Sequence, residues 1–97
     1  MHVAALRVEL RIRGVRSLKE KRHTVKSVIA QLTTTFGAAV SEVADQEKWQ
    51  KATLGVALVA PQHGHLTRVM HAVERALHGR DDVEVLRIDT SFLETPS

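Results

Sequence analysis

Residues 17–37, SLKEKRHTVKSVIAQLTTTFG, contain a helix start, an apolar stripe, a basic face and a helix stop. Ser17 and Glu20 have the spacing of a capping box, in which the serine oxygen accepts from the amide of Glu20 and the glutamate carboxylate accepts from the amide of Ser17. Gly37 provides a left-handed C-terminal cap. Between these signals, one face of a 3.6-residue period is apolar. It carries Leu18, Val25, Ile29, Leu32 and Phe36. The stretch therefore predicts one amphipathic helix of about five turns.

Alternating apolar residues predict strands on both sides of this helix. Residues 4–12 place an apolar side chain at every second position, and Gly14 ends the pattern. Residues 38–44 and 52–60 form a predicted hairpin, whose second strand stops at Pro61 because proline cannot donate to a strand ladder. Residues 83–92 return to the strand pattern, with a slip between Val85 and Leu86 that a β-bulge would produce. The tail, residues 94–97, is expected to fray.

A second helix is predicted before the last strand. Its apolar residues recur at helical spacing ahead of a glycine cap, Gly79. They are Leu66, Val69, Met70, Val73 and Leu77. The order of elements is therefore βαββαβ. Right-handed crossovers around a split βαβ pair give an α+β, ferredoxin-like sandwich, in which both helices cover one face of a four-stranded antiparallel sheet with strands one and three central. We expect a single domain over residues 1–97.

The composition excludes several classes of chemistry. With 97 residues, of which 43% are apolar, the chain can bury one core. It has no cysteine, which excludes disulfides, thiolate nucleophiles, iron–sulfur ligation and cysteine-based zinc sites. No apolar run approaches the roughly 18 residues of a membrane span, and the N-terminus lacks the pattern of a signal peptide. A cytoplasmic protein with no membrane partner is expected.

Charge is distributed unevenly along the chain. Residues 11–26 hold seven of the fourteen basic side chains and a single acid, Glu20, whereas acidic side chains crowd residues 81–94. Such asymmetry suits either an anionic partner or head-to-tail self-association.

The basic side chains of the first helix share one of its faces. Lys19, Arg22 and Lys26 lie roughly opposite the apolar stripe, which is typical of a solvated face and also of a contact surface for a polyanion. Arg13 and Arg16 approach the start of the helix, where free amides and the helix dipole favour an anion such as a phosphate backbone. The candidate residues for nucleic-acid or anion binding are Arg13, Arg16, Lys19, Lys21, Arg22 and Lys26.

The predicted fold leaves one face of the sheet uncovered. RNA-recognition motifs stack bases on strand aromatics of this face, but the third strand has none. Its small and apolar centre favours sheet-to-sheet homodimerisation instead. Trp49, in the hairpin connection, either folds over the edge of the core or anchors a subunit interface. The candidate dimer-interface residues are Arg7, Trp49, Gly55 and Ala57.

Six histidines raise the question of a metal site. His63 and His65 open the second helix, and His71, Glu74 and His78 could share one of its faces, but such spacings arise easily and surface histidine is common. No metal and no cofactor is therefore predicted. Spacing alone identifies no Ser–His–acid order, glycine-rich phosphate loop or carboxylate pair, and acylphosphatase chemistry on this fold needs an asparagine, which the chain lacks. We expect a protein that is not an enzyme.

Several short stretches of the chain together carry a resemblance to a known family. They are SLKEKR at residues 17–22, VKS at residues 25–27, Phe36, SEV at residues 41–43, Trp49-Gln50 and Gly55. This set resembles the YlxP-like family, domain of unknown function family 503, over nearly the whole chain. One departure is Gly37, where the family usually has asparagine; either residue can cap a helix in the left-handed conformation. The resemblance implies the same fold. Because genes of the family lie near those for transcription-elongation, translation-initiation and ribosome-binding factors, it also implies an RNA or ribosome context.

The leading hypothesis from the sequence is a non-enzymatic, dimeric binding module that contacts RNA or a ribosomal particle through residues 11–26. Two alternatives come from other classes. One is a small-ligand regulatory module that binds at a dimer boundary, and the other is an adaptor for an acidic protein partner.

Overall fold

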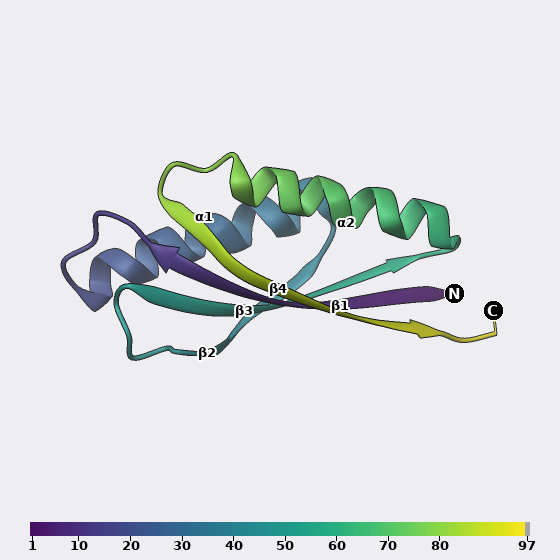
Figure 1. Ribbon diagram of the computed structural model, residues 1–97, viewed down its shortest axis with the longest axis horizontal. Helices are drawn as coiled ribbons and strands as arrows, with labels where there is room; N and C mark the ends of the chain where they lie inside the picture. The colour runs from purple at the N-terminus through teal and green to yellow at the C-terminus, as the bar shows by residue number, and fades with distance from the viewer. Residues whose placement is uncertain (97) are drawn as a thin grey trace.

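The computed structural model describes residues 1–96 and has the expected order of elements. These are β1 (His2–Ile12), α1 (Leu18–Phe36), β2 (Ala39–Ala44), β3 (Lys51–Ala60), α2 (His63–His78) and β4 (Val83–Glu94). The strands form one antiparallel sheet in the order β2-β3-β1-β4, so β1 and β3 are central. Both helices cover the same face of this sheet (Figure 1). The predicted α+β, ferredoxin-like sandwich is confirmed.

The two ends of α1 are set by local hydrogen bonds. Ser17 has an extended backbone, and its hydroxyl accepts from the amide of Glu20 at 3.2 Å. The carboxylate of Glu20 accepts from the amide of Arg16 at 3.1 Å, one residue before the partner that a standard capping box predicts. At the other end Gly37 is left-handed, with φ 65°, and its amide donates to the carbonyl of Thr33 at 3.0 Å. The helix therefore begins and ends where the sequence indicates.

The core lies between the helices and the sheet. Alternate residues of β1 and β3 face the helices and are buried, and each helix contributes one buried stripe. On α1 the stripe is shifted from the expected one, because Val28 is fully buried whereas Ile29 and Phe36 are only partly buried. The largest fully buried apolar side chains are Leu6, Leu10, Leu32, Leu54, Leu66 and Leu77.

The last strand is longer than predicted. Glu9 is opposite Arg87 and Leu10 is opposite Val85, so Leu86 is the extra residue of a bulge at the predicted slip. The expectation of a frayed tail is wrong for residues 94–95. Glu94 pairs with His2, and the amide of Thr95 donates to the carbonyl of Met1 at 3.1 Å. Ser97 lies outside the described residues.

The molecule is elongated, with principal extents of 46 × 22 × 20 Å. The β1–α1 and β2–β3 connections lie at one end of the long axis, and both chain termini lie at the other end beside the start of α2 (Figure 1). In the part of the chain that the structure describes, neither helix is long and apolar enough to cross a membrane.

Candidate nucleic-acid interface

Lys21 does not belong to the basic surface, and the prediction that it binds an anion is wrong. Its side chain is fully buried. The ammonium donates to the carboxylate of Glu42 at 2.6 Å and to the carbonyls of Asp45 at 2.9 Å and Gln46 at 3.3 Å. All three of its protons are therefore used inside the protein, where they join α1 to β2 and to the β2–β3 loop.

The spacing of the helix explains why Lys21 is buried. Leu18, Lys21, Val25, Val28 and Leu32 follow one another at steps of three and four, so Lys21 occupies a position of the apolar stripe. A lysine can take such a position because its long apolar stem packs while its charge finds a paired carboxylate. This spacing was the signal that could have identified it.

The β2–β3 loop is held by a second charged residue, Asp45. Its backbone is left-handed, with φ 64°, which lets its carbonyl reach Lys21. Its carboxylate accepts from the hydroxyl of Thr53 at 2.6 Å and lies 3.0 Å from the ammonium of Lys48. The Thr53 hydrogen bond, followed by the interaction with Lys48, lowers the pKa of Asp45 from 3.8 to about 2. The loop that carries Trp49 is thus anchored on both sides.

Four exposed cations of the β1–α1 connection and α1 make no ion pair among residues 1–96. They are Arg16, Lys19, Arg22 and Lys26. Most other basic side chains have a carboxylate partner in the described structure, and the two that do not, Arg68 and Arg75, lie on α2. Cations without a local counterion are therefore concentrated on α1 and just before its start. We call these four residues and Arg13 the basic surface.

Arg13 differs from the rest of the basic surface. One of its guanidinium nitrogens lies 3.7 Å from the carboxylate of Glu84, which also lies 3.6 Å from Arg11. This contact arises because β4 runs antiparallel to β1 and places its acidic start beside the basic end of β1. Glu84 and Arg13, from the acidic and basic parts of the sequence, are therefore neighbours in space. Head-to-tail association would need opposite charges at opposite ends of the molecule, and these residues do not provide them.

The basic surface is hollowed beside the start of α1. A cavity of about 580 Å³ is lined by the β1–α1 connection and the first turns of the helix, including Arg13, Lys19 and His23. A second hollow of about 310 Å³ continues along the helix between Lys19, Arg22, His23 and Lys26. At the helix start the Ser17 hydroxyl caps the amide of Glu20, and the Glu20 carboxylate accepts from the amide of Arg16. Basic side chains line both hollows and give them positive charge.

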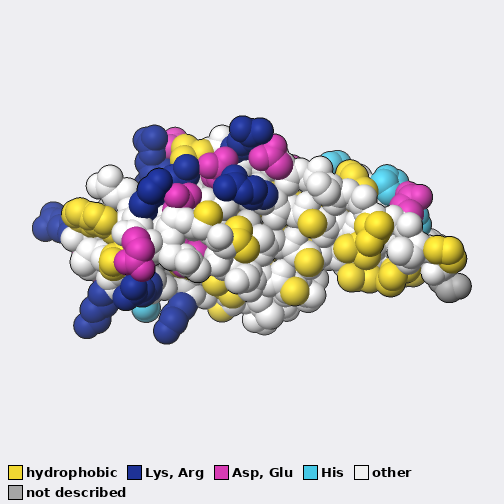
Figure 2. Space-filling model, turned by 90° about the horizontal axis from the view of Figure 1, so that it is seen from below, with side chains coloured by type: hydrophobic (Ala, Val, Ile, Leu, Met, Phe, Trp, Pro, Cys, Tyr) yellow, Lys and Arg dark blue, Asp and Glu magenta, His cyan; other side chains and the backbone are white. Residues whose placement is uncertain are grey.

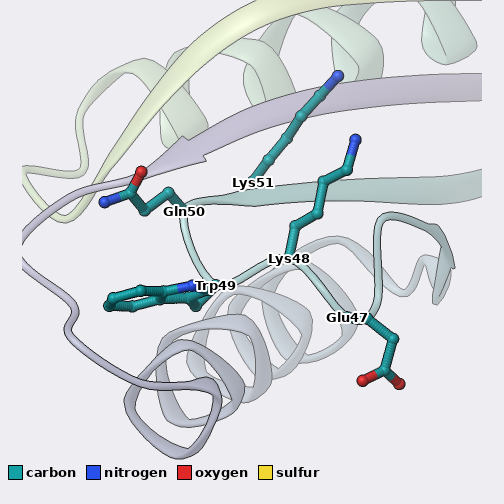
Figure 3. Close-up of a pocket in the computed structure, with 5 residues that line it drawn as sticks. All are labelled: Glu47, Lys48, Trp49, Gln50 and Lys51. Atoms are coloured by element: carbon teal, nitrogen blue, oxygen red, sulfur yellow. The ribbon is translucent and has the colours of Figure 1, made fainter.

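Trp49 lies at the same end of the molecule. Its side chain is 44% exposed, so just over half of its surface is covered by the protein and the rest is open to a partner. Figure 3 shows the indole extending from the β2–β3 loop toward the β1–α1 connection, while Lys48 and Lys51 extend away from it. The next residue, Gln50, accepts from the amide of Ile12 at 2.9 Å, which fixes the loop beside the start of the basic surface.

The structure brings together three of the four candidate dimer residues. Arg7 is directly opposite Gly55, and Ala57 follows on the same uncovered face of the sheet. Trp49 lies outside this group, in the β2–β3 loop. At Gly55 the side chain of Val43 closes over the strand, since a Cβ added to the glycine would lie 3.0 Å from it. Figure 2 shows this face, with charged side chains on one half and apolar ones on the half nearer the termini.

Among residues 1–96, neither His63 with His65 nor His71 with Glu74 and His78 forms a cluster of three potential metal ligands. His71 and His78 are exposed on α2. Within residues 1–96 the close grouping of potential metal ligands is instead His2, His63 and Glu94, at the end opposite the basic surface. His2 and Glu94 were missed because their distance in sequence hides their pairing across β1 and β4.

Comparison with known proteins relates this chain to a family. The family model described as "Protein of unknown function (DUF503)" matches residues 3–90. An uncharacterised protein of Bacillus subtilis (strain 168), YlxP, is 36% identical over 44 residues, which is 45% of this chain and 48% of that protein. The matched segment thus spans about half the length of the curated relative.

A solved structure is similar in fold. The de novo designed protein Foldit4 covers 97% of this chain and 99% of its own, with a TM-score of 0.52 and 9% sequence identity. This likeness concerns the fold only. Because the family model extends over most of the chain and includes α1, the β2–β3 loop and the sheet, the chain belongs to the DUF503 family of proteins of unknown function.

Proposed function

We propose that this protein is a binding module, not an enzyme, and that it binds single-stranded RNA or an RNA-containing particle such as the ribosome. The observation that carries the proposal is the position of the exposed Trp49 beside the basic surface, on which four of the five cations have no local counterion. Single-stranded nucleic acids are held by this combination, in which basic side chains follow the phosphates and an aromatic ring stacks on a base.

The arrangement of charge supports a backbone contact. Lys19, Arg22 and Lys26 project from successive turns of α1, and Arg16 lies just before the start of this helix, so the four can follow consecutive phosphates. Because they have no carboxylate partner in the described structure, binding a phosphate breaks no internal ion pair. If four of them neutralise phosphates of a single strand, log affinity falls against log salt with a slope of about −3.

The experiment measures the affinity of a fluorescently labelled oligouridine across a salt series. Arg22→Glu with Lys26→Glu should weaken binding and flatten the salt slope together. The matched control is Arg68→Glu with Arg75→Glu, which makes the same change of net charge at the two unpaired cations of α2. Equal losses in the two double variants, or no binding at low salt, would refute the proposal.

Stacking is tested separately through the single tryptophan of the chain. RNA that stacks on Trp49 should quench its fluorescence, and Trp49→Ala should lose about 1–3 kcal/mol of binding free energy with no change of salt slope. Trp49→Phe should retain most of the affinity because it keeps an aromatic face. Quenching that is absent at saturating RNA would remove Trp49 from the interface.

We also propose that the protein is a homodimer through the apolar half of the uncovered sheet face. Val59 and Leu93 are 67% and 58% exposed there, on either side of Val3, and the small residues Ala5 and Ala57 follow along the same face. A second copy can cover such a face by self-complementary packing. Light scattering at tens of micromolar should give twice the chain mass, and Val59→Arg should halve it. Leu86→Arg, at an exposed bulge in the charged half, should not. A monomeric wild-type mass would refute this part.

The two other classes of function make different predictions. A small-ligand module would bind at the dimer boundary, and an adaptor would bind an acidic protein. Co-purification from lysate with and without ribonuclease separates RNA binding from both of these classes, because only RNA binding makes co-sedimentation with ribosomes sensitive to the nuclease.

A further inference from the structure

The end of the molecule that carries the chain termini has a cluster that the RNA-binding proposal does not use. His2 lies at the start of β1 and Glu94 at the end of β4, and the strand register places them directly opposite each other. Both point to the helix side of the sheet, as their buried neighbour Ala4 does. His63 is the first residue of α2, so it approaches the same place from the helix layer. Three segments therefore converge there.

The atoms of this cluster are spaced like metal ligands. One nitrogen or oxygen from each of the three residues lies within 4.8 Å of the other two. The His2 Nδ1 atom and a Glu94 carboxylate oxygen are 3.4 Å apart. That separation is longer than an ordinary N–H···O hydrogen bond. It matches the distance of about 3.4 Å between two ligands of a tetrahedral zinc with bonds of 2.0–2.1 Å.

A second observation concerns the hydrogen bonding of His2. Its Nδ1 atom is buried and has no hydrogen-bond partner in the described structure. A buried polar atom without a partner is uncommon in folded proteins, and coordination of a metal ion would satisfy this nitrogen. The ring of His2 is held edge-on against the ring of His63, with centroids 5.7 Å apart, and the ring of Phe92 also packs against His63, with centroids 5.6 Å apart. The two imidazoles are thus fixed near each other by packing.

We propose that His2, His63 and Glu94 form a binding site for a divalent transition-metal ion, with zinc as the ion that fits best. Two imidazoles and one carboxylate, without cysteine, are a donor set that zinc accepts, and three protein ligands leave a fourth position for water. Glu94 and His63 are exposed side chains, so small rotations can bring all three ligand atoms to bonding distance. The ion would tie the start of β1, the end of β4 and the start of α2 together.

The test is zinc titration by calorimetry on the full chain, from which any polyhistidine tag has been removed. One zinc ion per chain is expected. His2→Gln and Glu94→Gln should each weaken binding at least about tenfold, since even an outer partner of a ligand costs that much. His78→Gln is the matched control, because it removes an exposed histidine at the far end of α2 and should leave the affinity unchanged.

A second measurement does not depend on variants. In NMR spectra of the wild-type side chains, zinc should shift the imidazole signals of His2 and His63 and leave those of His71 and His78 in place. Zinc at a hundred times its dissociation constant should raise the melting temperature by about 10 °C or more. The proposal is overturned if no saturable binding occurs, if the three variants bind alike, or if the shifted signals are those of other histidines.

Discussion

The buried Lys21 allows the most quantitative prediction, through the substitution Lys21→Met. Methionine keeps most of the apolar stem but removes the ammonium. The carboxylate of Glu42, whose side chain is 18% exposed, then loses a contact of 2.6 Å. The carbonyls of Asp45 and Gln46 lose their donor as well.

The magnitude follows from what remains in the protein after the change. Removal of one partner of a buried ion pair costs about 3–5 kcal/mol, because the other charge is left uncompensated. Since Glu42 retains some contact with water, we expect the lower end, about 3 kcal/mol. For a chain of this length, that loss lowers the melting temperature by about 12–24 °C. It is also a large share of the roughly 5–15 kcal/mol by which a domain is stable.

The assay is urea denaturation monitored by circular dichroism. An unchanged slope of the unfolding free energy against urea concentration checks that unfolding stays two-state. Lys19→Met is the matched control, because it makes the same chemical change at an exposed position of the same helix, where about 0.5 kcal/mol or less is expected. Adding Glu42→Gln to Lys21→Met should recover part of the loss, because it removes the unpaired charge. A Lys21→Met protein within about 1 kcal/mol of wild type would refute the reasoning.

Three further predictions concern local structure. Ser17→Ala should cost about 1 kcal/mol through loss of the helix cap, and an unchanged urea midpoint would show that the cap contributes nothing. Gly37→Ala should cost about 1–2 kcal/mol of unfolding free energy, because alanine is strained in the left-handed conformation while no atom lies within 4 Å of the added Cβ. Gly37→Asn should cost less, because asparagine tolerates this conformation better. Equal losses for the two variants in calorimetric melting would contradict this. Asp45 has a folded pKa of about 2, below its ordinary 3.8, so the unfolded state binds more protons in that window and stability falls as the pH falls through it. Thr53→Val should make this fall shallower, and parallel pH profiles of unfolding free energy would argue against the hydrogen bond as the main cause.

The element order and the boundaries of α1 follow from the sequence because their causes are local. A serine cap, a left-handed glycine and an apolar stripe act within one or two turns, so neighbouring residues are enough to indicate them. The bulge at Leu86 was visible for a similar reason, since one extra residue shifts the alternation of side chains. Three members of the basic surface, Lys19, Arg22 and Lys26, could likewise be named from helical spacing alone, because exposure on α1 depends mainly on the angle around the helix.

The tertiary structure decided which charges are available and which residues meet. Lysine is a residue type that usually lies at the surface. Lys21 can be buried only because the fold brings Glu42 and two loop carbonyls to its ammonium. The sequence likewise placed acidic and basic charges at opposite ends, whereas antiparallel pairing of β1 with β4 brings Glu84 to Arg13. The same pairing joins His2 to Glu94 and lets α2 add His63. Contacts between residues far apart in sequence depend on strand register and layer packing, which no local pattern encodes.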